Sequence, residues 1–194
     1  MSEAHLPFRS CGQDVTVYSM ARIIDPERIS IGDAVTIDDF VFLSAGRSTS
    51  IGSFVHLAAF SSYAGGGDLL IDDFAGISMG TRVFTGTDDF MGAGLTGPNV
   101  PAEFRAVERS FVRIGKHVII GANSVILPSV RIGEGAAIGA NSLVTTDCEP
   151  WTLYAGSPAR PIKKREKKKM LEQERALRAS HYDEAGQYRL KQRR

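Results

Sequence analysis

Aliphatic residues recur at every sixth position through residues 112–147, the most regular stretch of the chain. They are Ile114, Ile120, Ile126, Ile132, Ile138 and Val144. Small or β-branched residues stand four positions after each of them, and glycine directly follows four of them. A step of six residues leaves the face of an α-helix, and a half-buried strand alternates every two residues instead. The pattern is typical of a parallel β-helix, in which each hexad forms one short strand and one corner and its aliphatic side chain points inward.

The interval of six begins much earlier in the chain, with a different spacing between coils. From Cys11 to Val83, hexad positions form triplets with a step of six inside each triplet and eight between triplets. These coils repeat every 20 residues, whereas the later block repeats every 18. Three hexads per turn predict a triangular prism of roughly six coils, with two extra residues at one corner of each early coil.

The repeat is interrupted once, between Val83 and Val112. The intervening residues carry no hexad pattern, and a loop of this length without its own periodicity is uncommon in a compact domain. Four phenylalanines in this stretch argue against disorder, because they can anchor the loop. We therefore predict an all-β fold in which the β-helix spans residues 1–159 and residues 84–112 form one ordered loop extruded from a corner.

The composition changes after the last hexads. Residues 163–180 lack Gly and Pro and are rich in helix-forming residues, and residues 160–194 hold 13 Lys or Arg against 5 Asp or Glu. We predict a basic, α-helical C-terminal tail over residues 160–194, with its helix from Lys163 onward. A basic tail raises the question of nucleic-acid binding, but no recognition module precedes it, so no nucleic-acid partner is expected.

The N-terminus lacks the basic region and apolar run of a signal peptide, and no apolar stretch is long enough to span a bilayer. The two cysteines, Cys11 and Cys148, occupy hexad positions and have no metal-ligand spacing. We expect both to be buried free thiols. These features predict a cytoplasmic protein without membrane insertion.

Three features together resemble the left-handed β-helix acyltransferases: the Ile-Gly hexads, the extruded loop and the closing sequence GSPARPIK at residues 156–163. Within this family the chain is similar to galactoside and maltose O-acetyltransferases and to nucleotide-sugar acetyltransferases of O-antigen synthesis. Residues 87–90 and 95–101 resemble the enzymes that N-acetylate GDP-perosamine. The resemblance covers about residues 11–165. It implies left-handed coils, a homotrimer with active sites between neighbouring prisms, and acetyl-CoA as co-substrate.

The resemblance also implies the cofactor contacts. They fall on Ala122, Ala140, Thr145, Thr146, Arg160 and Lys163. A backbone N–H beside a glycine corner approaches the pantetheine arm closely because no side chain intervenes. Arginine and lysine in the closing segment suit the phosphates of CoA. Thr146 departs from the galactoside enzymes, which carry lysine at this position.

Acyl transfer needs a base for the proton of the nucleophile and a donor to the developing oxyanion. Of the four histidines, His56 lies at a corner after a predicted strand, whereas His117 is expected to turn outward. In the resemblance, the catalytic histidine of the family falls on Asp88 and a tyrosine that contacts the acceptor falls on His56. Asp89 and Phe90 are expected to bind the acceptor.

Two accounts of the chemistry follow from this departure. In the first, His56 is the base and a loop carboxylate orients it or binds the acceptor. In the second, no strong base is needed, because the Asp88 carboxylate positions the ammonium of an amino sugar and accepts its proton. The departure from the family's histidine favours N-acetylation of an amino sugar, nucleotide-linked and of the 4-amino-4,6-dideoxy type, for O-antigen and lipopolysaccharide biosynthesis.

Three alternatives remain at this stage. One is O-acetylation of a galactoside or maltose-type sugar. The second is a non-catalytic β-helix assembly factor, in which the extruded loop and the closing segment would have no function. A metalloenzyme of the carbonic anhydrase type needs three converging histidine ligands, which His56 and an outward His117 do not supply, so no metal site is expected.

Overall fold

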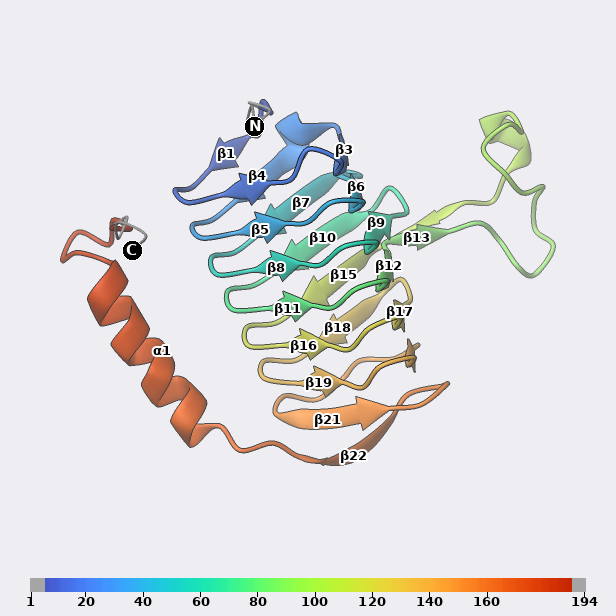
Figure 1. Cartoon of the computed structure of the whole chain (residues 1–194). Coiled ribbons are helices and arrows are strands. Elements are labelled where there is room, and N and C mark those ends of the chain that lie inside the picture. Colours follow the sequence, from blue (N-terminus) through green and yellow to red (C-terminus); the bar gives the residue numbers. More distant parts are fainter. Residues whose placement is uncertain (1–5, 190–194) are drawn as a thin grey trace.

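The computed structural model describes residues 6–189. Most of them form a triangular β-helix of about seven turns, whose three faces are sheets of parallel strands (Figure 1). The first sheet contains β1 (Ser10–Cys11), β4 (Ile29–Ile31), β7 (Ser48–Ile51), β10 (Asp68–Ile71), β15 (Phe111–Ile114) and β18 (Val130–Ile132). The second contains β2 (Thr16–Val17), β5 (Thr36–Ile37), β8 (His56–Leu57), β11 (Gly76–Ile77), β16 (Ile119–Ile120), β19 (Ala137–Ile138), β21 (Thr152–Ala155) and β22 (Arg160–Lys164). The third contains β3 (Arg22–Ile24), β6 (Phe42–Ser44), β9 (Ser62–Ala64), β12 (Arg82–Phe84), β17 (Val125–Ile126) and β20 (Leu143–Val144). In Figure 1 the chain crosses the near face from left to right, returns behind it and descends one coil, which is a left-handed winding.

The hexad residues line the inside of the prism, as the sequence predicts. Ile71, Ile114 and Ile132 stand in register on the first sheet and are at most 4% exposed. Burial of each such side chain contributes about 1.5–3 kcal/mol to folding. The small polar positions are also buried and satisfied, because the hydroxyls of Ser124 and Ser142 both donate to the Gly139 carbonyl, at 2.9 and 2.7 Å.

Two details of the shaft differ from the sequence-based expectations. The prism has one coil more than predicted, because the chain keeps pairing after the last hexad: Cys148 bridges to Ile132, and β21 continues the second sheet. Cys148 is buried, but Cys11 is exposed. Cys11 lies in β1, which is the edge strand of the first sheet among the described residues, so the first coil covers it on one side only.

The predicted extruded loop is present. β12 ends at Phe84 and β15 begins at Phe111, and between them β13 (Gly86–Thr87) and β14 (Glu108–Arg109) form an antiparallel stem. Beyond the stem, the 3₁₀ helix η2 (Ala102–Phe104) lies in the part that projects away from the prism (Figure 1). The loop leaves from the corner between the third and first sheets, where the early coils carry their extra residues and η1 (Pro26–Arg28).

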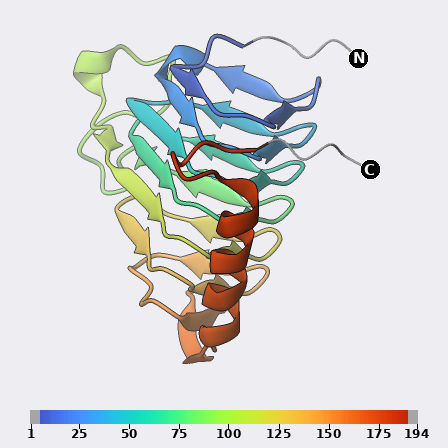
Figure 2. The same cartoon turned by 90° about the vertical axis from the view of Figure 1, so that its left-hand side faces the viewer.

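The C-terminal segment first adds a strand and only then a helix. β22 pairs antiparallel with β21 at the end of the second sheet. The helix α1 (Lys168–His181) therefore begins at Lys168 rather than at Lys163, and it runs back along one corner of the prism (Figures 1 and 2). Among residues 6–189 no helix has both the length and the apolar character that a membrane crossing requires.

The corner beneath α1 carries a stack of aromatic rings. Phe54 and Phe74 stack with centroids 4.9 Å apart, and His117 continues the stack at 5.1 Å from Phe74. His117 turns outward at this corner, as the sequence predicts, but it does not reach solvent because α1 covers it. Its Nε2 lies 2.8 Å from the Oε2 of Glu174, and its side chain is 4% exposed.

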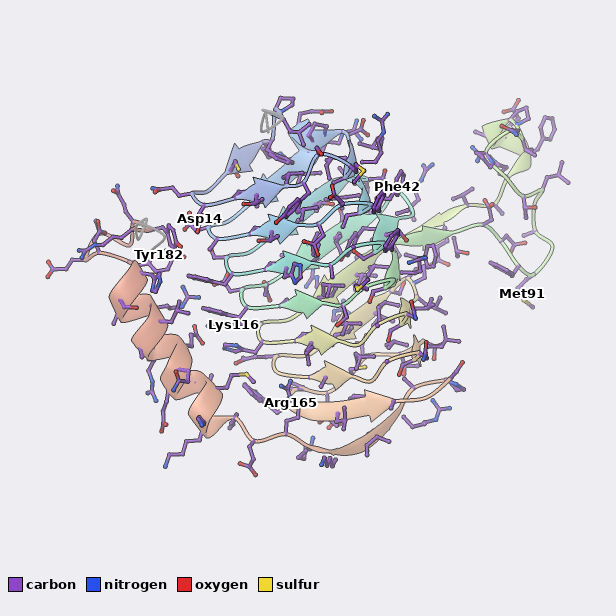
Figure 3. All side chains as sticks on the ribbon, in the orientation of Figure 1. Asp14, Phe42, Met91, Lys116, Arg165 and Tyr182 are labelled. Carbon is purple, nitrogen blue, oxygen red and sulfur yellow. The ribbon has the colours of Figure 1, made fainter. Side chains whose placement is uncertain are left out.

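Glu174 is the centre of the ion cluster that fastens α1 to the prism. Lys116 and Arg178 also pair with its carboxylate, and Lys116 lies on the side of the prism that faces α1 (Figure 3). Burial raises the pKa of Glu174, but hydrogen bonds from Lys116, Arg178 and His117 outweigh it and lower the pKa to about 2. Because this value lies below that of the unfolded chain, the stabilisation is complete above the ordinary glutamate pKa and is lost as the pH falls towards 2.

Glu174→Gln is expected to loosen α1, since it removes the carboxylate that pairs with Lys116 and Arg178 and that lies beside His117. We expect the free energy for opening the helix to fall by about 2 kcal/mol at pH 7, and its dependence on acid to disappear. Hydrogen exchange of the amides of residues 168–181 measures this directly. Glu172→Gln, an exposed position on the same helix, is the matched control. Equal exchange in the two variants would contradict the prediction.

Candidate active site

An imidazole and a carboxylate lie side by side on the outer face of the second sheet. His56 opens β8, and Asp38 directly follows β5, which pairs with β8 so that Thr36 stands beside His56. The His56 Nε2 lies 2.9 Å from the Asp38 Oδ2. Because a carboxylate only accepts hydrogen bonds, Nε2 carries the proton in the neutral ring and Nδ1 keeps the lone pair. The His56 side chain is 54% exposed, so the ring is accessible to a substrate.

The imidazole borders a cavity of about 420 Å³ on the same face. The cavity is lined by His56, Ala58, Gly76, Ile77, Ser78, Met79, Ile119 and Ala122. Gly76 lies between His56 and Ile119 across three neighbouring strands. Apart from His56 and Ser78, the lining side chains are apolar, so the cavity suits an apolar group held next to an imidazole.

A row of amide groups runs from this cavity along the corner between the second and third sheets. Among the described residues, the N–H groups of Met79, Ala122 and Ala140 donate to no protein acceptor. The residue after each alanine donates to the carbonyl one coil earlier at 2.9 Å, which places the three positions in successive coils. The amide of Ala59, one coil before Met79, is also unpaired, so the row follows from the repeat itself. Such groups bind ligand oxygens without an intervening side chain.

The other predicted cofactor residues lie around the C-terminal end of the prism. Thr145 and Thr146 follow β20, and Arg160 and Lys163 belong to β22; all four are exposed. The residues to which the sequence assigns the cofactor therefore extend from this end of the prism to the cavity beside His56.

The predicted residues of the loop lie elsewhere within the same chain. Asp88 accepts a hydrogen bond from the Gly97 amide at 3.0 Å. Asp89 accepts from two further loop amides, and these bonds lower its pKa below the ordinary value. The Phe90 side chain is 88% exposed. One chain thus brings His56 together with the corner amides, but it holds the loop residues away from His56.

Five residues of the site escaped the sequence-based prediction: Asp38, Gly76, Ser78, Met79 and Ile119. The sequence could have pointed to Asp38, because one coil period of 20 residues places it beside Ala58, close to His56. It could also have pointed to Gly76, since this glycine occupies an outward strand position where the neighbouring coils carry side chains. No group of three or more metal-ligating side chains occurs among residues 6–189.

Residues 111–146 match the family model described as bacterial transferase hexapeptide (six repeats). The dTDP-4-amino-4,6-dideoxy-D-glucose acyltransferase of Escherichia coli is 41% identical over 174 residues, covering 89% of this chain and 90% of that protein. The chain belongs to the hexapeptide-repeat acyltransferase family.

A solved structure within this acyltransferase family matches nearly the whole chain. AntD, an N-acyltransferase from Bacillus cereus, has been solved as a serine variant with dTDP-4-amino-4,6-dideoxyglucose and coenzyme A. Its sequence is 42% identical to this chain, and the two structures superpose with a TM-score of 0.83. The match covers 90% of this chain and 92% of the AntD chain. Another AntD structure holds dTDP and 3-hydroxybutyryl-CoA. The AntD variants include changes of one serine and of one aspartate ten residues further along.

A third relative is named for a different acceptor group. WbbJ of Escherichia coli strain K12, provisionally named as a lipopolysaccharide biosynthesis O-acetyl transferase, is 33% identical over 147 residues. The match covers 71% of this acyltransferase chain and 69% of WbbJ.

Proposed function

We propose that the chain transfers an acyl group from acyl-CoA, such as acetyl-CoA, to the 4-amino group of a dTDP-linked 4-amino-4,6-dideoxy sugar. The observation that carries the proposal is the pair of His56 and Asp38 at the edge of an apolar cavity. A base held by a carboxylate, next to a place for an acyl group, is what amide formation from a thioester requires. The Escherichia coli relative is named for a dTDP-linked 4-amino-4,6-dideoxy sugar and AntD holds one, which supports the acceptor class.

The donor is proposed to lie along the corner between the second and third sheets. Arg160 and Lys163 meet its phosphates at the C-terminal end of the prism, and Thr145 and Thr146 border it there. The unpaired N–H groups of Ala140 and Ala122 donate hydrogen bonds to the pantetheine arm. This direction delivers the thioester to the cavity, where the unpaired amide of Met79 is available to its carbonyl oxygen.

The chemical step follows from the state of the His56 ring. The neutral 4-amino group attacks the thioester carbon, and the new C–N bond forms as negative charge develops on the carbonyl oxygen. The proton leaves the nitrogen for His56 Nδ1, and Asp38 stabilises the resulting imidazolium through Nε2–H. The C–S bond then breaks, the amide is released, and the CoA thiolate takes up the proton.

The loop residues are proposed to act across a subunit boundary. In a homotrimer, the loop of one chain reaches the face of the next, so that Asp88 of one subunit meets the acceptor beside His56 of another. Exposed apolar side chains support such an assembly: Phe90 is 88% exposed on the loop, and the stacked rings of Phe40 and Phe60 are 49% and 53% exposed on the prism. Asp88 then positions the substrate ammonium and accepts its first proton, which leaves the neutral amine that attacks the thioester, with Asp89 and Phe90 beside it.

The spacing of the substituted AntD residues supports Asp88 as well. In this chain Ser78 and Asp88 are also ten residues apart, and Ser78 lines the cavity of His56. Ser62 and Asp72 share the spacing, but neither lines that cavity. An acceptor held by Ser78 and Asp88 places its amine next to the imidazole.

The same catalytic parts can act on a hydroxyl, and the name of WbbJ favours O-acylation as the second candidate. We place the N-acylating function first because the relatives that match about nine-tenths of the chain are an acyltransferase of a dTDP-linked amino sugar and an N-acyltransferase. We further propose that the product serves lipopolysaccharide or O-antigen synthesis and that the enzyme works in the cytoplasm, where CoA thioesters and nucleotide sugars are made.

Release of CoA thiol, measured with acetyl-CoA against a panel of acceptors, tests the proposed function. The panel contains dTDP-4-amino-4,6-dideoxyglucose, GDP-perosamine and a simple galactoside. We expect the highest kcat/KM with the dTDP amino sugar, a lower value with the GDP sugar, and no turnover of the galactoside. Turnover of the galactoside, together with none on either amino sugar, would replace the proposal by O-acylation.

A further inference from the structure

Gly76 differs from every other glycine among residues 6–189. Each of the others either has a positive φ, which favours glycine, or has a heavy atom within 3.0 Å of the place where a Cβ would stand. At Gly76 the φ is ordinary and no heavy atom lies within 4 Å of that place. Neither the backbone nor the packing of the chain accounts for the missing side chain.

A glycine at this position weakens the fold. β11 lies inside the second sheet, paired on both sides with β8 and β16. Glycine in the interior of a strand has no side chain to pack and loses more backbone entropy than other residues, and a β-branched residue fits such a position better. The space above Gly76 is part of the cavity beside His56. The missing side chain therefore leaves room for a ligand in that cavity.

We propose that Gly76 is the floor of a notch that holds the acyl chain of the donor and admits chains longer than acetyl. This inference rests on the proposed function and names its donor class. The amide row along the corner brings the thioester to the cavity at Met79, with the carbonyl carbon next to His56. The chain beyond that carbon then extends over Gly76 towards Ile119.

The chemistry of the walls favours the acyl chain over the acceptor sugar. A sugar nucleotide presents hydroxyls and phosphates, which need polar partners, whereas the notch offers apolar side chains such as Met79 and Ile119. Among residues 6–189, the only polar side chains that line the cavity are those of His56 and Ser78. AntD has been solved with 3-hydroxybutyryl-CoA, a donor whose acyl group has four carbons.

Calorimetric titration of CoA, acetyl-CoA and butyryl-CoA, without any acceptor, tests the notch in wild type, Gly76→Ala and Gly76→Val. Wild type is expected to bind butyryl-CoA at least as tightly as acetyl-CoA. Gly76→Val is expected to weaken butyryl-CoA about tenfold or more, to weaken acetyl-CoA less and to leave CoA unchanged. Gly76→Ala should be intermediate. Ser30→Val, on the outer face of the first sheet, is the matched control and should change none of the three.

Two outcomes would overturn the inference. One is equal weakening of all three ligands by Gly76→Val. The other is unchanged binding of all three, which together with a raised KM for the amino sugar would assign the notch to the acceptor. Since the titration contains no acceptor, it remains decisive if no amino sugar is turned over, so the two proposals fail separately. We expect Gly76→Val to melt no lower than wild type; if it does not fold, the order of affinities in Gly76→Ala decides.

Discussion

Replacing His56 with alanine is expected to lower kcat/KM for the amino sugar by about 100- to 10,000-fold, the range that a positioned general base contributes. The loss should fall on kcat, because the imidazole acts on a proton that moves only during the reaction. The melting temperature should not change, since the side chain is 54% exposed and, within residues 6–189, its only side-chain hydrogen bond is with Asp38. Steady-state thiol release at saturating acyl-CoA measures the effect.

The partner of the imidazole provides the internal control. Asp38→Asn keeps the size of the side chain but removes the charge that stabilises the imidazolium, so it should lower kcat less than His56→Ala does. The double variant should be no slower than His56→Ala alone, because the two groups act as a unit. Asp68→Asn, a carboxylate of the first sheet that pairs with Arg47, should retain wild-type activity. If His56→Ala kept full activity, His56 would not be the base. The reaction would then need only the Asp88 carboxylate to position the amine and accept its proton.

Replacing Asp88 with asparagine is expected to lower kcat/KM by about 100-fold or more, mainly through KM for the amino sugar. The carboxylate is proposed to hold the substrate ammonium, and a charged hydrogen bond is worth about twice a neutral one. Asparagine still offers an oxygen to the Gly97 amide, so the loop should keep its conformation. Glu103→Gln, an exposed position in η2 of the same loop, is the control and should behave as wild type.

Mixing the two inactive variants tests whether the site is shared between subunits. In a trimer whose sites take His56 from one chain and Asp88 from the next, random mixing of His56→Ala and Asp88→Asn chains should restore about a quarter of the wild-type activity. The chains are denatured together and refolded before the assay. No recovery, with trimers formed, would mean that both residues of a site come from one chain or that Asp88 is not part of it.

The architecture could be predicted from the sequence because one physical rule generates it. An aliphatic residue such as Ile120 must point inward in every coil, and the interval of six records that requirement directly. The interruption at Val83 marked the loop for the same reason. The helix α1 was harder to place, since its anchoring depends on single ion pairs such as Glu174 with Lys116, for which no repeat exists. The burial of His117 follows from that placement and was missed with it.

The site was predictable only in part. His56 stood out as one of four histidines, but its partner Asp38 becomes visible only when coils are stacked in register. Gly76 is one of 20 glycines, and its distinction lies in the empty space above it, which requires coordinates. The role of Asp88 remains a prediction that depends on a trimer, because within one chain the loop lies away from His56.

The structure of the product tests the central claim most directly. After reaction of acetyl-CoA with dTDP-4-amino-4,6-dideoxyglucose, mass spectrometry gives the number of acetyl groups and proton NMR gives the attachment site. The account predicts one acetyl group and an amide N–H coupled to the proton at carbon 4 of the sugar. An ester at a ring hydroxyl with the amine still free would contradict it.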